Sequence, residues 1–122
     1  MAATYAQRKA LGDYGERLAA IELERQGLEV LERNWRCSRG ELDIVARSRD
    51  VLVACEVKTR TSERYGTAMQ AITPVKAARL YRLLFTWCAE HEWPLSAIRV
   101  DVVTVVIARR TSPVVTHHVG VA

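Results

Sequence analysis

Two acidic residues interrupt apolar segments in the first half of the chain, and both have the chemistry to bind a metal ion. Asp43 stands in ELDIVAR (41–47) and Glu56 in VLVACEVK (51–58), with Lys58 two residues further on. Carboxylate oxygens are the ligands that Mg²⁺ and Mn²⁺ favour. Two carboxylates that hold such an ion beside a lysine are suited to cutting phosphodiester bonds, because the cations stabilise the negative charge of the reacting phosphoryl group.

The short connection between these two segments predicts that the carboxylates lie close together. Arg49 and Asp50 can form a two-residue hairpin turn, in which Asp43 lies opposite Glu56. Opposed Cβ atoms are about 5 Å apart, and Lys58 projects from the same face as Glu56 because strand side chains alternate. The turn sequence is not the most favourable one, and a slip of one residue would separate the carboxylates. The structural alternative is a salt bridge of Lys58 with either acid, without a metal.

Two ionised carboxylates in such a position repel each other. At about 4 Å and an effective dielectric of about 20, the repulsion is of order 4 kcal/mol. A fold accepts that cost mainly for function or when a cation compensates it, and Lys58 offsets one of the charges. Glu16, in the first helical segment, is a third candidate ligand. With it, the negative charge that remains would be balanced by one Mg²⁺ ion.

The composition fits one globular domain with a basic surface. The chain has 122 residues and a net charge of +4, with hydrophobic residues at 49% and charged residues at 26%. Arginines gather between residues 33 and 64, which indicates a polyanionic partner, with a solvated basic face as the alternative. The side chains that we expect to contact phosphates are Arg36, Arg39, Arg60, Arg64 and Lys76.

Several other classes of protein are disfavoured. The chain contains no apolar run of the roughly 20 residues that a membrane span requires, and its first residues lack the apolar stretch of a secretory signal, so a cytoplasmic location is expected. The three cysteines form no CxxC motif. We interpret the His117–His118 pair as residues of the C-terminal tail without a role, with metal binding as the alternative. Walker loops, nucleophile elbows and dinucleotide fingerprints are absent from the sequence.

The periodicity of apolar residues predicts one α/β domain with an αβββαβ order. The expected elements are a helix over 6–26, strands over 28–36, 41–47 and 51–58, a helix from Thr73 to about His91, and a strand over 98–108. The short links predict an antiparallel meander for the three strands. Thr73 and Pro74 mark the start of the second helix, and 109–122 form a tail that could add an edge strand.

The same periodicity predicts which side chains are buried. In the first helix the apolar stripe consists of Leu11, Tyr14, Leu18 and Ile21. Glu16 instead shares a face with small residues, where another element could approach closely. In the second helix the expected core residues are Val75, Leu80, Leu83, Leu84 and Trp87. In the last long strand Arg99 and Asp101 share a face and are expected to form a structural ion pair, with metal binding by Asp101 as the alternative.

Several short blocks resemble those of a known family. GDYGERLA, NWR, GELDIV, EVKTR, KAAR and RVDVV occur in this order over residues 9–106 and are similar to the YraN-like family of bacterial proteins. That family resembles archaeal Holliday-junction resolvases and, more broadly, the PD-(D/E)xK nucleases with a restriction-endonuclease-like core. The resemblance implies a mixed central sheet flanked by helices, in a single domain over 1–122 with a core at about 9–108.

The resemblance also assigns roles to individual residues. Asp43 and Glu56 match the two acids of the nuclease motif, and Lys58 matches its lysine. Glu16 matches the helix-borne acid of the resolvases, and Gln70 matches a polar residue that follows the core motif. The one departure is a leucine before the first acid, where the motif name has proline.

These observations together predict a Mg²⁺- or Mn²⁺-dependent endonuclease that acts on structured DNA, with RNA as the alternative substrate. Asp43 and Glu56 are the expected metal ligands, the Val57 carbonyl could complete the shell, and Glu16 would bind a second ion or a water molecule. The sequence leaves open whether catalysis is retained. A non-catalytic nucleic-acid-binding module and a scaffold protein are the alternatives, and a homodimer is one option for the assembly.

Overall fold

In the part of the chain that the structure describes, two helices and five strands follow one another. The computed structural model describes residues 4–61, 72–94, 97–108 and 110–121. The elements are α1 (Tyr5–Arg25), β1 (Glu29–Cys37), β2 (Gly40–Ser48), β3 (Val51–Arg60), α2 (Pro74–Glu90), β4 (Ala97–Val106) and β5 (Val114–His118). Within those ranges, neither helix is long and apolar enough to cross a membrane.

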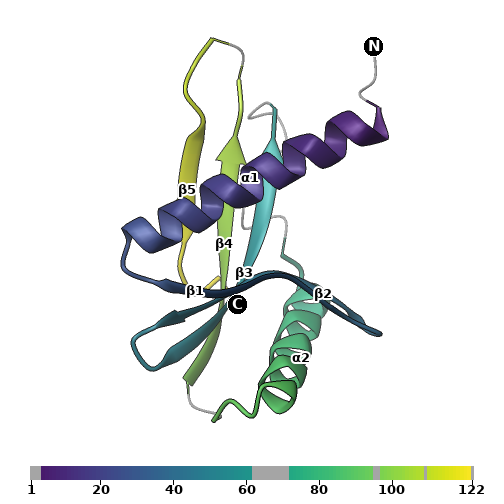
Figure 1. The fold of residues 1–122 in the computed structure, drawn as a ribbon, viewed down its shortest axis with the longest axis vertical. Coiled ribbons are helices and arrows are strands. Elements are labelled where there is room, and N and C mark those ends of the chain that lie inside the picture. Colours follow the sequence, from purple (N-terminus) through teal and green to yellow (C-terminus); the bar gives the residue numbers. More distant parts are fainter. Residues whose placement is uncertain (1–3, 62–71, 95–96, 109, 122) are drawn as a thin grey trace.

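The strands form one mixed sheet in the order β1-β2-β3-β4-β5. β1, β2 and β3 are antiparallel neighbours, β3 and β4 are parallel, and β5 runs antiparallel to β4 at the edge. The predicted αβββαβ core is therefore confirmed, as is the edge strand in the tail. Figure 1 shows the strong twist of the sheet, in which β1 and β2 run across the direction of β4 and β5.

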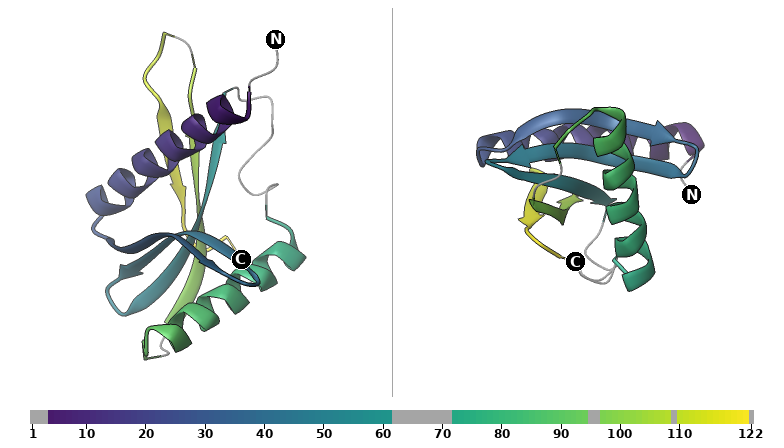
Figure 2. Two further views of the ribbon diagram at one scale, coloured as in Figure 1. Left: turned by 45° about the vertical axis from the view of Figure 1, so that its right-hand side comes forward. Right: turned by 90° about the horizontal axis from the view of Figure 1, so that it is seen from below.

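Both helices begin at a threonine cap, and both pack on the sheet. Thr4 Oγ1 accepts a hydrogen bond from Gln7 N at 3.1 Å, and Thr73 Oγ1 accepts one from Lys76 N at 3.1 Å. Pro74 follows Thr73 at the first helical position, as predicted. The helices are separated by the strands, as the two views of Figure 2 show.

The two faces of the sheet carry separate cores. On one face the small side chains of α1 and Leu23 pack on Ile44, Ala46, Val53, Cys55, Val103 and Val105. On the other face Leu80, Leu83, Leu84 and Trp87 of α2 pack on Trp35, Val45, Leu52, Ala54 and Val100. β3 and β4 contribute to both cores, which explains why their sequences are almost continuously apolar.

The face that α1 buries differs from the predicted stripe. Gly15, Ala19, Ala20 and Leu23 are buried, whereas Ile21 is 57% exposed. Small residues win because they let the helix approach the sheet: a Cβ atom on Gly15 would lie 2.0 Å from Thr59 Oγ1. The close approach predicted for that face of α1 is confirmed.

One apolar residue of α2 also lies outside the predicted core. Val75 is 70% exposed, while the other four expected residues are buried. Val75 stands in the first turn of α2, immediately after Pro74.

Candidate functional site

The register of the β2–β3 hairpin is the one predicted. Arg47 pairs with Leu52 and Ile44 pairs with Cys55, with Arg49 at a φ of 57° in the turn. Asp43 and Glu56 lie one residue further from the turn than the Ile44–Cys55 pair, Asp43 on β2 and Glu56 on β3.

Asp43 and Glu56 line one pocket between the hairpin and α2. The pocket has a volume of about 280 Å³. Its other lining residues are Gly40, Glu41, Lys76, Arg79, Leu80 and Leu83. The hairpin therefore brings the two carboxylates to the same concave surface, and α2 adds two basic side chains.

Asp43 is a half-buried carboxylate with little compensation. Its Oδ2 accepts a hydrogen bond from Val57 N at 2.9 Å, and no cation pairs with it among the residues described. Burial, followed by the charge of Glu56, raises the pKa of Asp43 to about 7, against the effect of the Val57 hydrogen bond. The charge of Glu16 raises this pKa further. Near neutral pH, the carboxyl group of Asp43 therefore exchanges readily between its neutral and anionic forms.

Glu56 is held by two lysines from different elements. Lys58 Nζ lies 3.3 Å and Lys76 Nζ lies 3.0 Å from the same oxygen, Glu56 Oε1. Burial and the neighbouring Lys76 lower the pKa of Lys58. Burial opposes the charged form of Lys76 as well, but its contacts with Lys58 and Glu56 outweigh this and raise its pKa. The salt bridge between Lys58 and Glu56 that the sequence offered as an alternative is thus present, and a second one joins it.

Glu16 lies in a neighbouring pocket rather than beside Glu56. That pocket of about 590 Å³ is formed by the first turns of α1 and by β1 and β2. With its amide nitrogen turned toward Glu16, Asn34 donates a hydrogen bond to Glu16 Oε1 at 2.8 Å. The backbone φ of Asn34 is 55°. Burial raises the pKa of Glu16, although the charge of Arg33 opposes this.

Glu41 joins the two pockets and was not among the residues predicted from sequence. It lines both of them, and its Oε2 forms an ion pair with Arg36 Nε at 2.8 Å. The signal available in the sequence was its spacing, because residues two apart on a strand share a face and Glu41 precedes Asp43 by two.

The expected phosphate-binding residues are distributed around this region. Arg36 and Arg39 line a shallow pocket at the β1–β2 turn, and both are exposed. Arg60 ends β3, where its Nη1 donates to Thr59 O at 3.3 Å. Arg64 and Gln70 lie outside the described residues. Lys76 is in the pocket but is engaged by Glu56.

The residues present fit a hard divalent cation that retains water ligands. No group of three or more His, Cys, Asp and Glu side chains in the described ranges is arranged to hold a metal by itself. Mg²⁺ commonly binds through one or two carboxylates, several waters and the phosphates of a substrate. Asp43 and Glu56 supply that number of carboxylates. Val57 N donates to Asp43 Oδ2 at 2.9 Å, so the backbone of Val57 lies next to this carboxylate.

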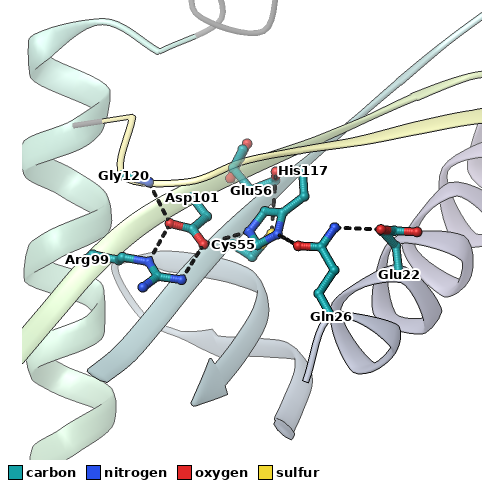
Figure 3. Close-up of polar contacts among 8 residues, drawn as sticks. All are labelled: Glu22, Gln26, Cys55, Glu56, Arg99, Asp101, His117 and Gly120. Atoms are coloured by element: carbon teal, nitrogen blue, oxygen red, sulfur yellow. Dashed lines mark hydrogen bonds and ion pairs between the residues drawn. The ribbon is translucent and has the colours of Figure 1, made fainter. Parts of the chain in front are cut away.

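A second polar cluster lies around Asp101, which is 0% exposed (Figure 3). Arg99 donates to both of its oxygens, at 2.9 and 3.2 Å, and Gly120 N donates to Oδ1 at 2.9 Å. His117 Nε2 lies 2.7 Å from Asp101 Oδ2, and His117 Nδ1 lies 2.8 Å from Gln26 Oε1. The predicted Arg99–Asp101 pair is confirmed.

The interpretation of His117 as a tail residue without a role was wrong. Its side chain is only 2% exposed because β5 places it between Asp101 and the end of α1. Although burial acts to raise it, the pKa of Asp101 is lowered by the hydrogen bonds from His117, Arg99 and Gly120. This cluster is a satisfied, structural one.

The fold and the pocket define a mixed α/β protein with an αβββαβ core, whose central hairpin carries two acids and a lysine. Residues 15–105 match the uncharacterised protein family UPF0102, and the chain belongs to that family, as the resemblance to YraN-like proteins implied.

Relatives in this family are similar over almost their whole length. A UPF0102 protein of Nocardioides sp. is 52% identical over 119 residues, covering 98% of this chain and 96% of its own. A UPF0102 protein of Streptomyces coelicolor is 53% identical over 117 residues, with 94% and 90% covered. One from Mycolicibacterium vanbaalenii is 50% identical over 115 residues, with 94% and 95% covered.

Proposed function

We propose that this protein is a metal-dependent nuclease that hydrolyses phosphodiester bonds in structured DNA, such as junctions or flaps. The observation that carries the proposal is the state of Asp43, which is held near Glu56 with a raised pKa and with an N–H group as its hydrogen-bond donor. A divalent cation would relieve this repulsion, so the protein gains stability when the cation binds. The resemblance to resolvases and PD-(D/E)xK nucleases supports the same chemistry.

The residues in and around the pocket would have different roles in this reaction. Asp43, Glu56 and the Val57 carbonyl would hold Mg²⁺ or Mn²⁺, and Glu16 would hold a second ion or a water molecule. When bound, the ion would supply Lewis-acid stabilisation of the phosphoryl oxygens. Lys58, with its lowered pKa and its place beside Glu56, would orient and activate the attacking water or stabilise the developing negative charge.

The basic side chains around the pocket would hold the nucleic-acid backbone. Arg36 and Arg39 would contact phosphates on the side of the β1–β2 turn, and Arg60 would do so at the end of β3, with Arg64 and Gln70 following it in the chain. A DNA substrate agrees with the cytoplasmic location that the sequence predicts. A homodimer would present two such pockets to a branched substrate.

A panel of labelled nucleic acids tests this function. Junction, flap, single-stranded and duplex DNA, and a matched RNA, are incubated with Mg²⁺, Mn²⁺ or chelator. We expect cleavage of a branched DNA that requires the metal and is lost in Asp43→Asn. Arg36→Gln and Arg39→Gln should weaken binding and flatten its dependence on salt by up to about one log–log unit each. Arg49→Gln, at the far end of the hairpin, is the matched control.

A non-catalytic nucleic-acid-binding module is the second candidate. Its support is that Lys58 and Lys76 already neutralise Glu56 without a metal. Salt-sensitive binding with no cleavage in either metal would favour this candidate. A protein that neither binds nor cuts any member of the panel would contradict both candidates.

A further inference from the structure

The feature from which we start is the pair of ammonium groups on one carboxylate oxygen. Lys58 follows Glu56 on the same strand, so its contact at 3.3 Å follows from strand geometry. Lys76 comes from the first turn of α2, beyond a segment of the chain that separates it from β3, and its contact is the shorter one at 3.0 Å. The second cation is therefore supplied by the tertiary fold.

The distribution of these cations is uneven. Both are at Glu56, which is 13% exposed, while Asp43 has a backbone N–H as its donor and, within the described residues, no ion pair. When all are ionised, the side chains of Asp43, Glu56, Lys58 and Lys76 have no net charge. The two positive charges nevertheless lie at one of the two acids. The pocket thus leaves one acid uncompensated beside another that is doubly paired.

A divalent ion bound by both acids would meet the Lys76 ammonium at the same carboxylate. Cations a few ångströms apart repel, so the ion and Lys76 compete for Glu56. Lys76 can yield, because its side chain is 30% exposed and has a flexible four-carbon stem. Lys76 lines the same pocket as Asp43 and Glu56, so its displaced ammonium could pair with a phosphate group of a nucleic acid bound at that pocket.

We infer that Lys76 is a built-in counter-ion of the metal site, which occupies Glu56 when the site is empty and transfers to a substrate phosphate when a divalent ion binds. This inference rests on the proposed function and adds a regulatory step to it. Metal and nucleic acid then bind with positive coupling. The ion displaces Lys76 from Glu56, and a phosphate of the nucleic acid provides a new partner for the displaced ammonium. The free protein would hold the ion weakly, and the metal site would be filled mainly when nucleic acid is bound.

Mn²⁺ binding measured by electron paramagnetic resonance tests the inference without any need for catalysis. Lys76→Met removes the ammonium at similar length, and we expect it to tighten Mn²⁺ binding to the free protein about tenfold. Arg79→Gln removes a positive charge from the same pocket without touching Glu56, so it should change the affinity by less than about twofold. A cleavage-resistant phosphorothioate oligonucleotide should raise the Mn²⁺ affinity of the wild type more than that of Lys76→Met. Lys76→Gln serves as a second variant, and thermal melts establish that each protein is folded.

The outcomes separate this inference from the proposed function. Equal Mn²⁺ affinity in the wild type and both Lys76 variants overturns the counter-ion role and leaves the metal site in place. Tighter binding in Arg79→Gln than in the Lys76 variants overturns it as well, since a general loss of charge would then explain the effect. Absence of Mn²⁺ binding in every protein, with and without the oligonucleotide, overturns both the metal site and the counter-ion.

Discussion

The sheet contains two aspartates whose pKa values are shifted in opposite directions. Asp101 is completely buried, and yet its pKa is lowered, because Arg99, His117 and Gly120 N donate to it. Asp43 is only half-buried, and yet its pKa is raised to about 7, because burial and then the charge of Glu56 disfavour its anion, and within the described residues a backbone N–H is its one hydrogen-bond donor.

The difference shows that burial alone does not determine the charge state of an acid. The number and charge of the partners that the fold supplies decide it. Around Asp101 the chain completes the network with its own donors, which is typical of a structural role. Around Asp43 the described residues supply no ion pair, and this is the region where a bound cation would compensate the charge.

The largest test of this comparison is Asp101→Asn. The substitution removes the buried anion, so Arg99 loses its counter-charge and His117 loses its carboxylate partner. We expect a loss of about 3–5 kcal/mol in the free energy of unfolding, measured by urea denaturation at neutral pH. The control is Asp13→Asn, an exposed acid that pairs with Lys9 at 3.0 Å and should leave the unfolding midpoint almost unchanged.

Equal stability of Asp101→Asn and the wild type would mean that the network does not hold β5 and α1 together. The structural role assigned to this region would then be wrong. A loss in both variants would point instead to a general sensitivity to charge.

The second test is the pH dependence of stability, in which Asp43 should act in the opposite direction. Its pKa is about 4 in the unfolded chain and about 7 in the folded protein. The folded state therefore binds the proton more tightly, and the cost of ionisation grows as pH rises through this range. Metal-free Asp43→Asn should be more stable than the wild type by at most about 4 kcal/mol at about pH 8, with the difference vanishing near about pH 4.

Urea denaturation in chelator across this pH range measures the effect. A difference between Asp43→Asn and the wild type that is constant with pH would show that Asp43 does not carry the unrelieved charge. Adding Mn²⁺ at about a hundred times its dissociation constant should stabilise the wild type by ~2.7 kcal/mol and Asp43→Asn by much less.

The smallest effect concerns α1, which spans both regions. Gly15→Ala places a Cβ atom 2.0 Å from Thr59 Oγ1, so we expect a loss of about 1–3 kcal/mol and a shift of the helix near Glu16. Gly12→Ala is the matched control, because nothing lies within 4 Å of its added Cβ atom, and it should gain about 0.5–1 kcal/mol. Thermal melts give the stabilities. Amide chemical shifts should change around Glu16 in Gly15→Ala and stay unchanged around Gln26.

The parts of the fold that depend on neighbouring residues could be predicted from the sequence. The two-residue turn at Arg49–Asp50 determined the hairpin register, and Thr73–Pro74 determined the start of α2. The buried face of α1 could not be predicted in this way, because a hydrophobic stripe such as that of Ile21 does not reveal how closely a helix approaches a sheet. The contact of Gly15 with Thr59 depends on the tertiary fold.

The candidate site divides in the same manner. The approach of Asp43 and Glu56 follows from local strand pairing, and the sequence predicted it. The contacts of Lys76 with Glu56 and of Asn34 with Glu16 join separate elements, so no spacing in the sequence could indicate them. His117 was missed for the same reason, since its partners Gln26 and Asp101 come from the C-cap of α1 and from β4.

The contact between Gln26 and His117, which links the first helix to the last strand, has a consequence for the order of assembly. A hairpin such as β2–β3 closes across its turn on the order of microseconds, whereas contacts between distant parts of a chain form late because loop closure is costly. The network around Asp101 includes such a distant contact, because Gln26 and His117 are 91 residues apart in the chain. We therefore expect this network to form after the transition state and to lengthen the lifetime of the folded protein by slowing its unfolding, without changing the speed of folding.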